Sequence, residues 1–136
     1  MPASATEPPP PALIVHNAAD IARALAPARP VTLLSPPGFA LYAGCLWWQS
    51  LLAAACFDGP ALLDCADAPG RALEALRLGL RGVILDPAAP AFARIATLAD
   101  EFGATLLAAP PPALDLAGEI APATLAAWLD AAKNPA

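Results

Sequence analysis

The sequence is poor in charged residues, and most of the few charges it has are acidic. Only 14% of its 136 residues are Asp, Glu, Lys or Arg, against about 25% in ordinary soluble domains. The seven basic residues are scattered along the chain, and the net charge is −5. Nucleic-acid binding depends on clustered Lys and Arg, so this charge balance argues against a nucleic-acid partner.

Common cysteine and phosphate motifs are also missing. The three cysteines, Cys45, Cys56 and Cys65, have neither CxxC nor metal-site spacing, which favours free thiols in a reducing cytoplasm. The chain contains neither G-x-G-x-x-G nor a Walker-type Gly-Lys-Ser/Thr sequence. The loop 35–38 is placed like a phosphate loop, but its two prolines lack the N–H groups that such a loop uses. A dinucleotide or nucleoside triphosphate site is therefore not expected.

The segment 31–57 contains no charged side chain, and it includes a predicted helix at Phe39–Cys56. A membrane-spanning helix needs about 20 apolar residues, which this helix nearly provides. However, Gln49 and Ser50 interrupt it, and no excess of Lys or Arg flanks it. It also follows a strand and a turn that fit a soluble repeat, so we predict no membrane segment.

Two parts of the chain differ in composition. Residues 1–11 are rich in Pro and Ala and are predicted to form a flexible N-terminal tail. Residues 12–136 are long enough for one domain with a substantial core, and we expect a single α/β domain there.

Short apolar runs alternate with helical patterns through this domain. Strands are predicted at Ala12–His16, Val31–Leu34, Ala61–Asp64, Gly82–Leu85 and Ala104–Ala108. Helices are expected between them, with a last helix that begins at Pro122. The predicted strands are apolar throughout rather than alternating, which is typical of parallel strands covered on both faces.

These patterns predict a three-layer α/β/α sandwich with about five parallel strands. The favoured strand order is the flavodoxin-like 2-1-3-4-5, and the alternative is a Rossmann-like 3-2-1-4-5 order. A closed (β/α)8 barrel needs about 200 residues or more, so a barrel is possible only as a half-barrel that dimerises.

Ligands in open α/β sheets bind beyond the carboxyl ends of the strands, where helix N-termini converge. Several polar or flexible residues are predicted to lie there and are the candidate ligand-binding residues. They are His16, Asn17, Ser35, Gly38, Asp64, Cys65, Asp67 and Asp86.

Asp64 and Asp86 end equivalent strands, so their carboxylates form a weak candidate Mg²⁺ site if the two strands are neighbours. An Asp before a helix also caps it, and we favour capping. No cofactor is predicted, with Mg²⁺ left as an open alternative. A small anion on the N–H groups of residues 38–40, near the Ser35 hydroxyl, also remains open.

The only histidine, His16, has the pKa range of a general base, but no nucleophile is visibly paired with it. A hydrogen-bonded structural role is favoured for it. Cys65 follows a strand and precedes a helix, so its pKa is lowered if the thiol faces the helix N-terminus.

The uncharged helix has more apolar surface than one sheet face covers. Trp47 and Trp48 point about 100° apart, so one of them should lie on the outer face with Leu51 or Leu52. Aromatic residues on an apolar outer face are typical of subunit interfaces. The candidate interface residues are Tyr42, Trp47, Trp48, Leu51 and Leu52.

We therefore predict a cytoplasmic, homo-oligomeric binding or interaction module, most simply a dimer, without recognisable catalytic apparatus. The alternative is a protein or enzyme that binds a small anion or phosphorylated ligand at the strand ends, with Mg²⁺ as a possible requirement.

Overall fold

The structure, a computed structural model, describes residues 9–131. Within this range the strands are β1 (Ala12–Ile14), β2 (Thr32–Leu34), β3 (Ala61–Asp64), β4 (Gly82–Ile84), β5 (Thr105–Leu107) and β6 (Ala113–Asp115). The helices are α1 (Ala18–Leu25), α2 (Phe39–Tyr42), α3 (Cys45–Ala54), α4 (Pro69–Arg77), α5 (Phe92–Glu101) and α6 (Pro122–Ala131). Every strand pair is parallel, which confirms the predicted α/β class.

The six strands form one open sheet in the order 5-4-3-2-1-6. An open parallel sheet with helices is consistent with the predicted α/β architecture, and the order is of the flavodoxin- or Rossmann-like kind. It differs in detail from 2-1-3-4-5 and from 3-2-1-4-5, because β2 lies between β1 and β3. From β1 to β5, each new strand is added beside the previous one on the same side of the sheet. The direction of addition reverses only after β5, when β6 pairs with the other side of β1.

The strand β6 is one that the pattern of apolar runs does not predict. It follows the prolines 110–112, and its pairing places Ala113 beside Ala12 and Asp115 beside Ile14. The connection from β5 to β6 contains no helix, so α6 follows β6 instead. Two contacts fix α6 to the sheet edge: the Trp128 Nε1–H donates to the carbonyl of Ala12 at 2.9 Å, and Arg29 pairs with Asp130.

The predicted continuous helix Phe39–Cys56 is wrong, because it is broken between α2 and α3. Gly44 has φ 92° and ψ 158°, a conformation that essentially only glycine adopts, and it ends the helical path. The rings of Phe39 and Trp48, on either side of the break, pack edge to face with their centroids 5.8 Å apart.

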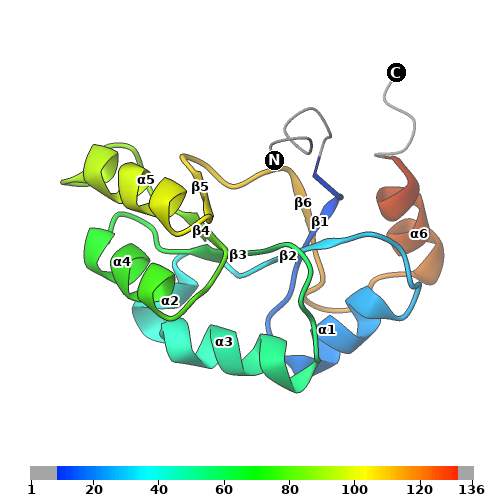
Figure 1. Cartoon of the computed structure of the whole chain (residues 1–136). Helices are drawn as coiled ribbons and strands as arrows, with labels where there is room; N and C mark the ends of the chain where they lie inside the picture. The colour runs from blue at the N-terminus through cyan, green and yellow to red at the C-terminus, as the bar shows by residue number, and fades with distance from the viewer. Residues whose placement is uncertain (1–8, 132–136) are drawn as a thin grey trace.

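The two faces of the sheet are covered differently. Helices α1 to α5 pack on one face and, together with Leu129 of α6, enclose the main apolar core, which includes Leu13, Leu33, Leu63 and Val83 from the strands. The side chains on the opposite face form a separate, smaller cluster that contains Ile14, Leu34, Leu62, Ile84 and Leu107. Figure 1 shows the strands tracing a U, with α1 to α4 along its outer side and the β5–β6 connection crossing its inner side.

The proline-rich start of the chain contributes to the inner side. The Thr32 N–H donates to the carbonyl of Pro11, and the Thr32 hydroxyl donates to the carbonyl of Pro10, both at 2.9 Å. The first eight residues of the predicted tail lie outside the described residues. Of the helices within residues 9–131, none combines the length and the apolar character needed to cross a membrane.

Candidate functional site

His16 and Asp115 meet beyond the carboxyl ends of β1 and β6, where the strand order reverses. The Nε2 atom of His16 lies 2.6 Å from Oδ1 of Asp115, and both side chains are partly exposed. Reversals of strand order create the crevice in which open α/β sheets bind ligands. Of the predicted residues, His16 is therefore the best placed to reach a ligand.

A partly buried network positions this pair. Asn17 caps α1 as predicted, since its Oδ1 accepts the N–H of Asp20 at 2.8 Å. Asp20 also accepts the backbone N–H of His16 at 2.9 Å and pairs with Arg23 at 2.8 Å. Arg23 in turn donates to the carbonyl of Leu116, directly after β6. The network joins the start of α1 to the end of β6 and so brings His16 to Asp115.

The carboxyl group of Asp115 is held in its ionised form. Partial burial raises its pKa, but the hydrogen bond from the Ala117 N–H and the contact with His16 lower it by more, so the net shift is downward. A carboxylate beside a histidine orients the imidazole ring. General-base catalysis would also require a nucleophile on the other side of that ring.

Ser35, which was predicted to lie near His16, is engaged elsewhere. Its side chain is buried, and its Oγ accepts the backbone N–H of Asp64 at 2.9 Å and donates to the carbonyl of Pro36 at 3.2 Å. The hydroxyl therefore links β2 to β3, and its surroundings assign it a structural role.

Asp64 and Asp86 do end neighbouring strands, as the Mg²⁺ alternative required. However, the Oδ1 of Asp64 accepts the N–H of Ala66, and the Oδ1 of Asp86 accepts the N–H of Ala88, both at 2.8 Å. Each carboxylate thus stabilises its own turn. Among residues 9–131, no three His, Cys, Asp or Glu side chains are grouped so that they could hold a metal ion.

The turn at Gly38 offers little to an anion. Gly38 has φ 66°, as glycine readily allows, and it precedes α2, which is only four residues long. The Phe39 N–H already donates to the carbonyl of Pro36 at 3.1 Å, and the Leu41 N–H donates to the carbonyl of Gly38 at 2.9 Å. Internal bonds of the turn therefore use part of the donor set that an anion would need.

The predicted lowering of the Cys65 pKa is wrong. The thiol is fully buried, and this burial, assisted by Cys45 and Asp64, raises its pKa to about 12. A thiol with such a pKa is protonated and unreactive at neutral pH. Asp67, another candidate ligand-binding residue, is exposed just before α4, and the N-cap of that helix is Ala68, which makes no side-chain cap.

The second candidate surface lies at the junction of α2 and α3. It consists of four exposed apolar side chains, Leu41, Tyr42, Leu46 and Trp47, which we call the α2–α3 patch. As predicted, one of the adjacent tryptophans faces outward: Trp47 is 54% exposed, whereas Trp48 is fully buried. Two other predicted interface residues are not available on the surface, since Leu51 is buried in the core and Leu52 is half-buried.

A cavity of about 820 Å³ lies on the inner face of the sheet, toward the amino ends of the strands. Its lining includes Thr32, Leu62 and Thr105 from the strands, Arg81 before β4 and Trp128 from α6. This site was not predicted, because the candidate ligand-binding residues all lie at or beyond the carboxyl ends of the strands, whereas the cavity lies toward the amino ends. The sequence feature that could have indicated this site is its prolines. Five of them line the cavity: Pro9, Pro10, Pro60, Pro111 and Pro112.

Comparison with known proteins provides no family assignment: the chain matches no protein-family model, no curated protein and no solved structure.

Proposed function

We propose that this protein is a homodimeric interaction module that associates through the α2–α3 patch. The observation that carries the proposal is the clustering of exposed apolar residues. Five large hydrophobic side chains are conspicuously exposed within residues 9–131, and four of them, Leu41, Tyr42, Leu46 and Trp47, lie within seven consecutive positions. The largest apolar patch on the surface of a protein is often a functional site.

The size of the patch is appropriate for the centre of an interface. Large side chains that are about half exposed contribute on the order of 100 Å² each, by comparison with the 150–250 Å² that an aromatic residue can bury. The four together supply about half of the roughly 800 Å² that each partner buries in a standard interface. Exposed uncharged residues of the same segment, including Ser50, Ala53 and Ala54, are available for the remainder.

The absence of charge in this segment favours a second copy of the same chain as the partner. A two-fold interface brings each surface against itself, so every charged residue near the axis meets its own like charge. No charged side chain occurs between Val31 and Phe57, although the chain as a whole carries a net charge of −5. Two copies can therefore associate here without bringing like charges into contact.

Sedimentation velocity over a range of protein concentrations tests the proposal. The wild-type chain of 13.7 kDa is expected to sediment as a dimer, and Trp47→Lys as a monomer, because a buried unpaired charge opposes association. Phe102→Lys is the matched control: Phe102 is 53% exposed, almost the same as Trp47, but it lies at the end of α5, outside the patch.

The control variant is expected to remain dimeric. A wild-type protein that stays monomeric up to millimolar concentration, or an equal effect of the two lysine substitutions, would contradict the proposal. Circular dichroism must first show that both variants keep the wild-type helix content.

A second candidate function is the binding of a small ligand at the carboxyl ends of β1 and β6. The observation that favours it is the contact between His16 and Asp115 at the reversal of strand order. Thermal-shift titration with phosphate and with Mg²⁺ provides the test. Stabilisation that His16→Gln abolishes would support this function, whereas unchanged melting temperatures in both proteins would count against it.

A further inference from the structure

We propose that the cavity on the inner face of the sheet binds an elongated apolar molecule that carries one carboxylate group. This site lies on the face of the sheet opposite to α1 to α5, so the proposal does not depend on dimerisation through the α2–α3 patch. The volume of about 820 Å³ falls within the roughly 300–1,000 Å³ of small-molecule pockets.

The floor of the cavity is formed by strand residues that point away from the helices. Ala12, Thr32, Leu62, Gly82 and Thr105 come from five neighbouring strands, β1 to β5. A Cβ atom on Gly82 would lie only 2.8 Å from Cδ2 of Leu62, so the leucine side chain leans over the glycine and makes the floor apolar. Such a floor favours a hydrocarbon chain over a polar ligand.

Five prolines contribute to the walls. Pro9 and Pro10 come from the start of the described chain, Pro60 comes from the turn before β3, and Pro111 and Pro112 come from the β5–β6 connection. Proline has a fixed φ and no N–H, so these walls are stiff and provide no backbone hydrogen-bond donor to water or to a polar ligand. A preformed apolar wall lowers the entropic cost of binding an apolar molecule.

Two of the polar side chains that line the cavity already donate hydrogen bonds within the protein. The Thr32 hydroxyl donates to the carbonyl of Pro10, and the indole N–H of Trp128 donates to the carbonyl of Ala12, both at 2.9 Å. Arg81 differs, because it lines the cavity, is exposed and has no ion-pair partner among residues 9–131. Its guanidinium is therefore available to a carboxylate, whose planar geometry matches the two parallel donors of arginine.

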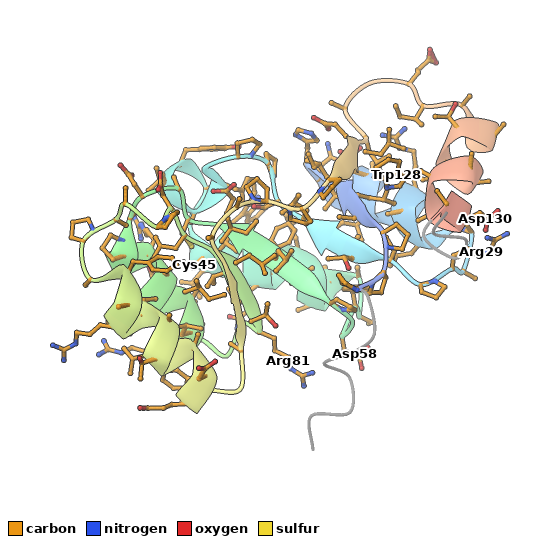
Figure 2. The ribbon with its side chains drawn as sticks, turned by 90° about the horizontal axis from the view of Figure 1, so that it is seen from above. Arg29, Cys45, Asp58, Arg81, Trp128 and Asp130 are labelled. Atoms are coloured by element: carbon orange, nitrogen blue, oxygen red, sulfur yellow. The ribbon has the colours of Figure 1, made fainter. Side chains whose placement is uncertain are left out.

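The charged lining residues lie at one end of the cavity and the aromatic residue lies at the other end. Figure 2 shows Arg81 and Asp58 near each other at one border of the sheet, and Trp128 well away from both, beside α6. A ligand with its carboxylate on Arg81 can thus extend its apolar part along the floor toward Trp128. Asp58 also lines this end, and its negative charge weakens the attraction for an anion.

Isothermal titration calorimetry with decanoate, and with decanol as the uncharged analogue, tests the site. Decanoate is expected to bind one molecule per chain, more tightly than decanol. Arg81→Met should weaken decanoate binding about tenfold, the usual scale for one charge-assisted hydrogen-bonded contact, and leave decanol binding unchanged. Asp58→Asn should strengthen decanoate binding about twofold by removing the opposing charge.

Three further variants locate the binding. Thr105→Trp places a large side chain in the cavity from an exposed position on an edge strand and should abolish binding of both compounds. Arg94→Met removes an exposed charge outside the cavity lining, and Trp47→Lys changes the α2–α3 patch, so neither should alter the affinity.

Absence of decanoate binding, equal affinity for decanoate and decanol, or binding that Thr105→Trp leaves intact would each overturn the proposal. Binding that is lost only in Trp47→Lys would place the ligand on the patch instead and would overturn it as well. Because dimerisation is measured separately by sedimentation, failure of the cavity proposal leaves the proposed function standing, and the reverse also holds.

Discussion

The neighbouring tryptophans Trp47 and Trp48 should respond in opposite ways to replacement by alanine. Trp48 is fully buried, and its ring packs edge to face on Phe39 with the centroids 5.8 Å apart. Loss of a buried Trp side chain costs about 3–5 kcal/mol, because the surrounding core does not close the space. A domain has only about 5–15 kcal/mol of stability in total, so Trp48→Ala should remove a large part of it.

Trp47→Ala should leave the stability of the monomer almost unchanged. More than half of this side chain is exposed, and such surface substitutions usually change the free energy of unfolding by about 0.5 kcal/mol or less. The substitution should instead reduce the free energy of dimer formation. If association buries about 100 Å² of each Trp47, the loss is about 2.5 kcal/mol for each protomer. Even one such loss weakens dimerisation by more than about fiftyfold.

Urea unfolding followed by circular dichroism, at several protein concentrations, separates the two effects. The unfolding midpoint of a dimer rises with protein concentration, whereas that of a monomer does not. Trp48→Ala should lower the midpoint at every concentration, and Trp47→Ala should remove the concentration dependence alone. A larger loss of stability from Trp47→Ala than from Trp48→Ala at low concentration would refute the burial assignment. A concentration dependence that survives in Trp47→Ala would refute the role of the patch.

Further predictions concern two glycines and the buried thiols. Gly82→Ala should destabilise the protein by about 1–3 kcal/mol in urea unfolding, because its Cβ would lie 2.4 Å from the backbone oxygen of Ala61. The control Gly70→Ala, in α4 with open space around it, should instead stabilise by about 0.4–1 kcal/mol, and equal effects would contradict this distinction. At pH 8, Ellman's reagent should label the exposed Cys56 alone in the native protein, since burial raises the pKa of Cys45 to about 11 and of Cys65 to about 12. In the unfolded chain these thiols ionise near pH 9, so their contribution to the free energy of unfolding should be fully present below pH 9 and should be lost as the pH rises toward 12. Cys65→Ala should make the free energy of unfolding fall less steeply with pH in this range, and an unchanged dependence on pH would contradict the assignment.

The repeated alternation of strands and helices could be predicted because each strand is a short apolar run between clear turn signals. The bounds of β3, Ala61–Asp64, agree with the prediction to the residue. The strand β6 directly follows three prolines and contains only two apolar residues, Ala113 and Leu114, before Asp115. Its hydropathy therefore does not distinguish it from a loop. Leu-Asp after an apolar residue recurs at 63–64, 85–86 and 114–115, but it also occurs at 129–130 within α6, so this motif does not identify the end of a strand by itself.

The strand order could not be predicted, because every short crossover is compatible with a neighbouring strand on either side. The break before Gly44 was also hidden, because hydropathy is continuous through 39–56 and a glycine within a helix is tolerated at a cost of about 1 kcal/mol. The polar strand ends were located correctly, but their roles depend on local geometry. Asp64 and Asp86 each accept a backbone N–H from the residue two positions later. Residue type and position alone do not distinguish such a turn from a ligand site.

The position of the cavity follows from the strand order. Because β1 to β5 are added in one direction, α1 to α5 all pack on the same face, and the other face is left to the β5–β6 connection, the prolines and Trp128. A closed β/α barrel fills its inner face with side chains from all around the ring. Here the sheet is open between β5 and β6, and the apolar cluster on its inner face is small among the described residues. The α2–α3 patch belongs to the helical layer on the opposite face, so two copies can associate through it while the entrance of each cavity remains open. Ligand affinity should therefore be the same in the wild-type dimer and in monomeric Trp47→Lys, and a difference between them would mean that the two faces are coupled through the sheet.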